Sequence, residues 1–226
     1  MNYDWNFARL GPYWKAFLFG TATTLELTLL VVIIGTCLGV LVGLLLPRRG
    51  ARLVLYPIVD VVRAIPPLVL LLFMYFLLTQ QVIGTTVTAF WVYVVAMSLN
   101  LAAFTADVVR AAIENVPLAS IQAARALGMS RKQVTRYILL PYVFREAVPA
   151  MTVLYIGMLK MSSLASVINV REVVYAAQTV IADISRSLEA WIVVAVIYIV
   201  LVVPASHLSR RVEAWAKRGA APIKEI

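Results

Sequence analysis

The sequence predicts an all-α transmembrane protein built as a bundle of five membrane-spanning helices. Hydrophobic residues make up 62% of the chain and its mean hydropathy is +0.91, which is typical of membrane proteins and not of soluble domains. Five apolar segments also reach the roughly 20 residues that a helix needs to cross a bilayer. These segments lie at about 16–46, 53–78, 87–109, 147–168 and 190–208.

The distribution of basic residues predicts how the spans are oriented. Arginine and lysine are concentrated between the first and second spans, between the third and fourth, and after the fifth, whereas residues 79–90 contain none. Cytoplasmic loops carry such an excess, so we expect the N-terminus outside and the C-terminus in the cytoplasm of a multi-pass protein of the cell inner membrane. The net charge of +9 is explained by this topology and by contact with anionic lipids of the bilayer, and nucleic acid is not an expected partner.

This topology divides the chain into three parts. Residues 1–15 form an extracytoplasmic segment, residues 16–210 a single transmembrane domain, and residues 211–226 a cytoplasmic basic tail. The sequence contains no internal repeat or low-complexity tract that would split the domain. Five spans are too few to enclose a translocation path, so we expect a second similar chain across a two-fold interface.

The first two spans carry signals of their own. Gly35, Gly39 and Gly43 recur every four residues in the first span, a pattern that predicts close approach of another helix. In the second span, Pro66 and Pro67 follow one another, and both cannot lie in an undisturbed helix, so we expect a kink there.

Four polar residues inside the spans are candidates for a substrate pathway: Glu26, Arg63, Asn100 and Lys160. A charge at the bilayer centre costs roughly 2.5–3.5 kcal/mol on insertion scales, so each should have a partner or water. For Arg63, neutralisation by Asp60 one helical turn earlier and a place in the pathway are equally supported. Lys160 can extend toward the membrane surface or pair with Glu26, and a hydrogen bond to a neighbouring helix is the favoured role of Asn100.

Two short helices are predicted in the basic stretch 115–141, between the third and fourth spans. The first runs from Leu118 to Leu127 after Pro117, and Gly128 suits its left-handed C-cap. Ser130 stands three residues before Gln133, which predicts a capping box at the start of the second helix. Its apolar stripe comprises Val134, Tyr137 and Ile138, and Pro141 is expected to end it.

The segment from Ser166 to Leu188 has the polar content of an extracytoplasmic or re-entrant connection, with Asn169 and Gln178 as expected interruptions.

Several stretches resemble one known family. "QAARALG" (122–128), followed after nine residues by "ILLP" (138–141), resembles the EAA loop of ABC-importer permease subunits. "VRAIPPLVLLLFMYF" (62–76), "SLNLAAFTADVVRAAIENVP" (98–117) and "SLASVINVREVVYAAQT" (163–179) resemble the polar amino-acid subfamily of these permeases. The resemblance extends over about residues 20–210.

The resemblance implies the type I ABC importer permease fold and import of amino acids or amino-acid-like solutes. The helix-Gly-helix at 117–141 would couple the spans to a separate ATPase, through residues that match the family's loop: Gln122, Ala123, Ala124, Leu127, Gly128 and Pro141. The implied partners are two copies of that ATPase, a second permease subunit, identical or homologous, and a periplasmic or extracytoplasmic solute-binding protein.

The chain departs from the family pattern at two places. Gln122 replaces the usual Glu, which keeps hydrogen bonding but removes a negative charge and puts an ion pair with the ATPase in doubt. "KMSSL" (160–164) replaces the usual K-D-[ST]-S-L, so the acidic neighbour of Lys160 is missing.

We expect no enzyme activity in the chain itself. It has no G-x-x-x-x-G-K-[ST] phosphate-binding loop, no Cys/His metal cluster and no nucleophile motif, so no catalytic site, metal site or cofactor is expected here, and ATP with Mg²⁺ belongs on the partner ATPase. An ATP-independent ion-coupled carrier or channel is the main alternative, although its inverted repeat does not suit five spans. A membrane scaffold, which needs no charges within the spans, is a third.

Overall fold

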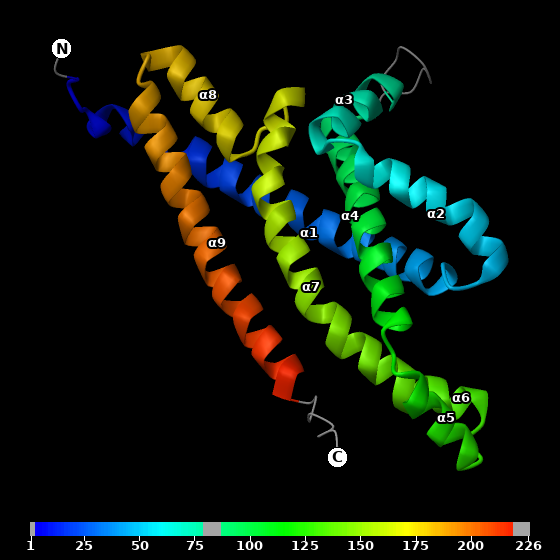
Figure 1. Ribbon diagram of the computed structural model, residues 1–226. Helices are drawn as coiled ribbons and strands as arrows, with labels where there is room; N and C mark the ends of the chain where they lie inside the picture. The colour runs from blue at the N-terminus through cyan, green and yellow to red at the C-terminus, as the bar shows by residue number, and fades with distance from the viewer. Residues whose placement is uncertain (1–2, 79–86, 219–226) are drawn as a thin grey trace. The chain divides into compact units, whose positions relative to one another are not determined.

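All regular structure is helical in the computed structural model, which describes residues 3–78 and 87–218 (Figure 1). The all-α fold class is therefore confirmed. The elements in chain order are η1 (Phe7–Tyr13), α1 (Trp14–Leu45), α2 (Arg49–Ala64), α3 (Pro67–Leu78), α4 (Ala89–Glu114), α5 (Leu118–Ala126), α6 (Arg131–Val134), η2 (Thr135–Leu139), α7 (Leu140–Met161), η3 (Ser162–Ile168), α8 (Val173–Ile184) and α9 (Ser187–Arg218).

The expected spans correspond to long helices. Within the described residues, four helical stretches are long and apolar enough to cross a membrane, and the broken pair α2 and α3 makes a fifth if it counts as one span. The four stretches are Phe7–Leu45, Ala89–Glu114, Arg131–Ile168 and Ser187–Ala216.

The second span is broken where the two prolines predicted a kink. Helix α2 ends at Ala64 and α3 begins at Pro67. Proline has no N–H group and restricts the residue before it, so a helix cannot run through two in succession, whereas proline suits the first position of a new helix. The Pro66 carbonyl accepts the first bond of α3, from the Leu70 N–H at 3.0 Å.

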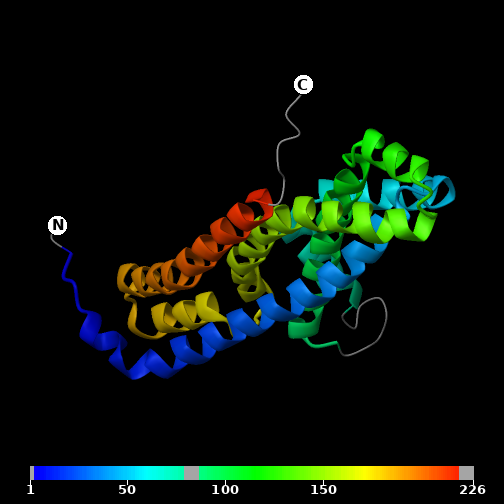
Figure 2. The same cartoon turned by 90° about the horizontal axis from the view of Figure 1, so that it is seen from below.

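The chain forms two compact units, and the long helices α1, α4, α7 and α9 contribute to both (Figures 1 and 2). Unit 1 comprises residues 1–34, 65–98 and 155–205. Its core joins the N-terminal segment to α8 and the start of α9, through residues that include Leu10, Phe17, Val173 and Val194.

Unit 2 comprises residues 35–64, 99–154 and 206–226, and α1 and α4 pack very closely within it. A Cβ atom added at Gly39 would lie 2.5 Å from the Thr105 Cβ, and one at Gly43 would lie 2.7 Å from the Val109 Cβ. The close approach predicted from the glycine spacing is therefore confirmed, with α4 of the same chain as the partner.

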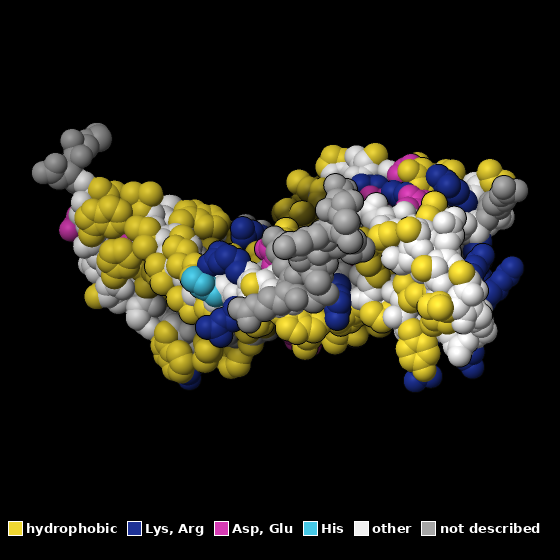
Figure 3. Space-filling view, turned by 60° about the horizontal axis from the view of Figure 1, so that its bottom comes forward, with side chains coloured by type: hydrophobic (Ala, Val, Ile, Leu, Met, Phe, Trp, Pro, Cys, Tyr) yellow, Lys and Arg dark blue, Asp and Glu magenta, His cyan; other side chains and the backbone are white. Residues whose placement is uncertain are grey.

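Many hydrophobic side chains of the spans are exposed on the surface of the chain, as expected for helices that contact lipid. Of the span windows, that of α4 is 72% buried within the chain, whereas that of α9 is only 17% buried and leaves Ile199 and Val200 exposed. Hydrophobic side chains form broad areas on the face shown in Figure 3, and basic side chains gather between them. Helix α4 is therefore the most enclosed span.

The segment between the fourth and fifth spans is more regular than predicted. It contains helix α8, and Gln178 is exposed within this helix without interrupting it, so that expectation was wrong. An exposed amide in a helix needs no break because water or headgroups satisfy it. Asn169 does end η3, in a left-handed conformation with φ of 61°.

Candidate functional site

Helix α5 is a short, well-terminated helix that follows α4 after three residues (Figures 1 and 2). Gly128 follows its last turn with φ of +79°, a conformation that favours glycine. The Gly128 N–H bonds to the Arg125 carbonyl at 3.0 Å, and the Met129 N–H bonds to the Ala124 carbonyl at 3.1 Å. These two bonds form a Schellman motif, so the predicted glycine cap is confirmed.

Helix α6 begins with the predicted capping box. The Ser130 hydroxyl accepts from the Gln133 N–H at 3.4 Å, and the Gln133 side chain accepts from the Ser130 N–H at 2.8 Å. Because both ends of the turn between α5 and α6 are capped, the direction in which the chain leaves α5 is fixed by backbone hydrogen bonds.

The second helix was predicted to end at Pro141, and this prediction was wrong. It continues from Arg131 through η2 and α7 to Met161. Helix η2 is a π-helical turn, closed by the Leu140 N–H bonding to the Thr135 carbonyl five residues earlier. The wider turn accommodates a residue that can neither donate a bond nor fit its ring against a normal preceding turn.

Most exposed residues of α5 are non-polar, although the charged Arg125 is also exposed. Leu118 is 72% exposed and Leu127 is 83% exposed, and Gln122, Ala123 and Ala126 are also exposed. We call these five residues the coupling face. Ala124, which the resemblance places among the coupling residues, is only 4% exposed and therefore does not belong to this face: its side of α5 faces inward.

Helix α6 and η2 also differ from the predicted stripe at one residue. Val134 is buried and Ile138 is half-buried, as predicted, but Tyr137 is 64% exposed. Arg131, Lys132 and Arg136 are exposed, as expected for the polar side. The helix-Gly-helix therefore presents an apolar face and a basic face to its surroundings.

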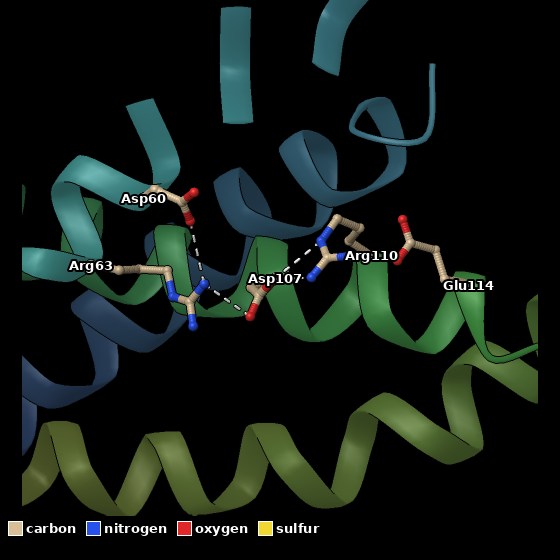
Figure 4. Close-up of polar contacts among 5 residues, drawn as sticks. All are labelled: Asp60, Arg63, Asp107, Arg110 and Glu114. Atoms are coloured by element: carbon tan, nitrogen blue, oxygen red, sulfur yellow. Dashed lines mark hydrogen bonds and ion pairs between the residues drawn. The ribbon is translucent and has the colours of Figure 1, made fainter. Parts of the chain in front are cut away.

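Five charged residues on α2 and α4 form a chain of ion pairs in unit 2 (Figure 4). The Arg63 guanidinium lies 3.0 Å from the Asp107 carboxylate and 3.7 Å from Asp60. Asp107 in turn accepts from Arg110 at 2.6 Å, and Arg110 also pairs with Glu114. Arg63 additionally lies 5.4 Å from the centre of the Phe104 ring.

This network answers the question raised by Arg63. Both aspartates neutralise its charge, which favours the structural role over the pathway role. The closer partner, Asp107, was missed by sequence reasoning. The spacings of three and four residues between Asp107, Arg110 and Glu114 could have indicated the ion pairs within α4, but not the pair with Arg63, which lies on another helix.

The other three pathway candidates are not brought together. Asn100 is 1% exposed, and neither atom of its amide has a partner, so the predicted hydrogen bond to a neighbouring helix is not formed. Glu26 is exposed on α1. Lys160 is exposed near the end of α7, and the described residues contain no ion pair between it and Glu26.

A buried carboxyl group at Glu172 was also missed. The side chain is fully buried, accepts from the Tyr175 N–H at 2.9 Å and caps α8. The Thr24 hydroxyl donates to it at 3.4 Å. Burial raises the pKa of Glu172 to about 7. In the sequence, Glu172 stands just before the apolar run that begins at Val173, and this position is the local signal that could have indicated a helix cap.

Comparison with known proteins assigns the family. Residues 35–218 match the family described as binding-protein-dependent transport system inner membrane component. The glutamine transport system permease protein GlnP of Escherichia coli (strain K12) is 31% identical over 215 residues, which are 94% of this chain and 97% of that protein. The arginine transport system permease protein ArtQ of Bacillus subtilis (strain 168) is 32% identical with the same coverage.

A solved structure supports the same assignment. The crystal structure of an amino acid ABC transporter with histidines matches with a TM-score of 0.85 and 31% identity, over 95% of this chain and 99% of that one. The type I importer fold expected from the resemblance is thereby confirmed. The chain belongs to the family of binding-protein-dependent transport system inner membrane components, the transport subunits of ABC importers.

Proposed function

We propose that the chain carries amino acids or amino-acid-like solutes inward across the cell inner membrane, driven by ATP hydrolysis on a separate subunit that docks at the coupling face. The relatives from glutamine and arginine transport systems support this cargo class. The single observation that carries the docking site is the exposed, mostly apolar coupling face on a helix whose C-terminal end is fixed by the backbone bonds of Gly128 and Met129.

The geometry of α5 suits a docking element. A preformed helix loses little conformational entropy when it binds, and Leu118 and Leu127 offer apolar area for a hydrophobic cleft. Gln122 lies on the same face and presents a neutral amide to it. Recognition through this face therefore depends on shape and apolar contact, with no carboxylate at position 122 to pair with a basic residue of the ATPase.

Movement of α5 would be passed directly to two spans. Helix α4 ends three residues before α5, and α6 follows it after Leu127–Ser130 and continues unbroken into α7. When the ATPase closes on nucleotide, α4 and α7 move with the docked helix, which changes the side of the membrane to which the pathway opens.

The expected assembly contains more than this chain. Two ATPase copies carrying ATP and Mg²⁺, a second permease and an extracytoplasmic solute-binding protein complete it, and the relatives' family description, which names binding-protein dependence, supports that last partner. The N-terminus is proposed outside, residues 211–226 in the cytoplasm, and Glu26, Asn100 and Lys160 along the pathway, with Arg63 holding α2 to α4 instead.

Photo-crosslinking at adjacent positions tests the docking site. In a Cys37→Ser background, which removes the single native cysteine, a benzophenone maleimide is attached at Ala123→Cys, on the coupling face. Ala124→Cys is the matched control, because Ala124 is next to Ala123 in the sequence but is buried. Gln178→Cys is an exposed control on α8.

We expect only the Ala123→Cys protein to be crosslinked to a subunit that contains a phosphate-binding loop and hydrolyses ATP, identified by mass spectrometry in native membranes. Irradiation should also stop ATP-driven amino-acid uptake. A transporter that keeps its uptake after complete labelling and irradiation at Ala123→Cys, with no ATPase attached, would overturn the proposal. The same variants test the topology, since an impermeant maleimide should reach Gln178→Cys from outside intact cells and Ala123→Cys only after permeabilisation.

A further inference from the structure

The most informative feature outside the coupling face is an amphipathic groove in unit 1, formed by the end of α7, η3 and α9. It has a volume of about 400 Å³ and is lined by Lys160, Ser163, Tyr198, Ile199, Val202 and Val203. The lining of the groove thus combines one ammonium group and two hydroxyl groups with three aliphatic side chains.

Lys160 differs from Arg63, the other basic pathway candidate, in its electrostatic surroundings. Arg63 pairs with two carboxylates, at 3.0 and 3.7 Å. Lys160 forms no ion pair with any described residue, no acidic residue lines the groove, and the next residue is Met161. Lys160 is exposed and its ammonium group faces a mainly aliphatic groove without a carboxylate, so the groove is complementary to an anionic group.

The depth of the groove identifies the source of that anion. Tyr198 stands twelve residues after Arg186 and twelve before Arg210, along α9. At about 1.5 Å per residue, it lies roughly 18 Å from each of these charged positions, near the middle of a hydrocarbon core about 30 Å thick. A lipid phosphate does not reside at that depth, whereas transported solutes are bound there.

The hydroxyl groups around Lys160 are held in place by local bonds. The Ser163 hydroxyl donates to the Lys160 carbonyl at 3.0 Å, and the hydroxyls of Tyr198 and Ser162 lie 3.1 Å apart. The contact between Ser162 and Tyr198 joins η3 to α9, and the Lys160 ammonium has no ion-pair partner among the described residues. The site is therefore preorganised for a ligand that brings its own negative charge.

We propose that this groove binds the α-carboxylate of the amino-acid cargo during translocation, with Lys160 as the group that recognises it and Ile199, Val202 and Val203 contacting the aliphatic part. This inference rests on the proposed function, because it assigns a site for the same cargo. It assigns this role to Lys160 and not to Arg63, whose charge is already paired with two aspartates. The groove contains no acid for the cargo's ammonium group, so it distinguishes a carboxylate from a carboxamide and not one amine from another.

The experiment has two stages, so that failure of the proposed function and failure of the site are distinguishable. The complete transporter, purified from native membranes with its ATPase and binding protein, is reconstituted in vesicles and offered a mixture of the twenty standard amino acids, and the lumenal contents are measured by mass spectrometry. ATP-dependent accumulation of at least one amino acid supports the proposed function. No accumulation of any refutes that function and the site with it.

The second stage measures binding of the accumulated amino acid, and of its carboxamide, to the permease–ATPase complex in detergent by equilibrium dialysis, without the binding protein. The variants are Lys160→Met, Lys160→Arg and, as a control for loss of a lysine, Lys15→Met, whose side chain lies beside the Trp14 ring on the exposed start of α1.

We expect Lys160→Met to weaken binding of the acid by about tenfold or more, as loss of a charge-assisted contact does. Lys160→Arg should restore most of it, and Lys15→Met should bind normally. The wild type should prefer the acid to the carboxamide, and Lys160→Met should bind both equally. A purely structural role of Lys160 would weaken both ligands alike. Retained preference for the acid in Lys160→Met, or no binding of the accumulated amino acid to the wild type, would overturn the inference.

Discussion

Replacing Gly39 by alanine should destabilise the chain strongly because α1 and α4 have no room for a side chain there. The added Cβ would lie 2.5 Å from the Thr105 Cβ and 2.7 Å from the Ala102 carbonyl oxygen, whereas ordinary contacts begin at 3.4 Å. The shortfall at Thr105 is 3.4 minus 2.5, or 0.9 Å. Since neither atom can rotate away, the helices must separate.

The expected cost lies at the upper end of the usual range for overpacking, about 3 kcal/mol. For a chain of this length each kcal/mol lowers the melting temperature by roughly 2–4 °C, so Gly39→Ala should melt roughly 6–12 °C below the wild type. Gly43→Ala should be nearly as damaging, because its Cβ would also meet a backbone carbonyl, that of Ala106 at 2.8 Å. Gly35→Ala should cost less, because its nearest contact, the Leu101 Cβ at 2.9 Å, is longer and its three nearest atoms include no backbone carbonyl.

The assay is the fraction of fluorescently tagged protein that remains monodisperse on gel filtration after heating. Gly157→Ala is the control: it too lies inside a helix, but an added Cβ would meet nothing within 4 Å, so helix propensity should stabilise it by about 0.5–1 kcal/mol. If Gly39→Ala and Gly157→Ala melted at the same temperature, the close packing of α1 against α4 would be refuted.

Three further changes test other parts of the chain. Gly128→Ala adds a Cβ that meets no atom but forces alanine to φ of +79°, at a cost of about 1 kcal/mol, and it should lower ATP-driven uptake more than Gly157→Ala does. Asp107→Asn removes the closer partner of the half-buried Arg63 and should cost about 1–3 kcal/mol in thermal unfolding, against about 0–1 for the longer, more exposed pair in Asp60→Asn. Burial raises the pKa of Glu172 to about 7, above the value of roughly 4.3 that a glutamate has in the unfolded chain. The contribution of the protonated carboxyl group to stability is therefore present at low pH and is lost as the pH rises between these two values. The melting temperature should fall between about pH 4.5 and pH 7.5, and Glu172→Gln should remove that fall.

The spans were predictable because a bilayer demands one property over some twenty residues, and a long apolar run reports it without any knowledge of neighbours. The capped turn at Gly128 and Ser130 was predictable for a similar reason, since caps depend on contacts within a few residues. The helix across Pro141 was not, because nothing local indicates that a π-helical turn will accommodate the ring.

Features that depend on distant contacts could not be obtained from the sequence. The four alanines in α5 have the same chemistry, and only the packing of the folded chain separates the buried Ala124 from the exposed Ala119, Ala123 and Ala126. The buried Glu172 likewise accepts a hydrogen bond from Thr24, a residue 148 positions earlier, and no local pattern indicates that contact. The candidate site was thus predictable as a segment, whereas the residues that face a partner were not.

Within unit 2, helix α4 carries two rows of contacts that together determine how a force applied at α5 is transmitted. One row, with Leu101, Thr105 and Val109, meets the glycines of α1. The other, with Phe104 and Asp107, holds Arg63 of α2. Tight packing tolerates little sliding, and the ion pair tolerates little separation, so α1, α2 and α4 of this unit have to move together. A displacement of α5 should therefore shift the three helices as one body instead of bending α4, and breaking either row should reduce uptake more than it reduces ATP hydrolysis.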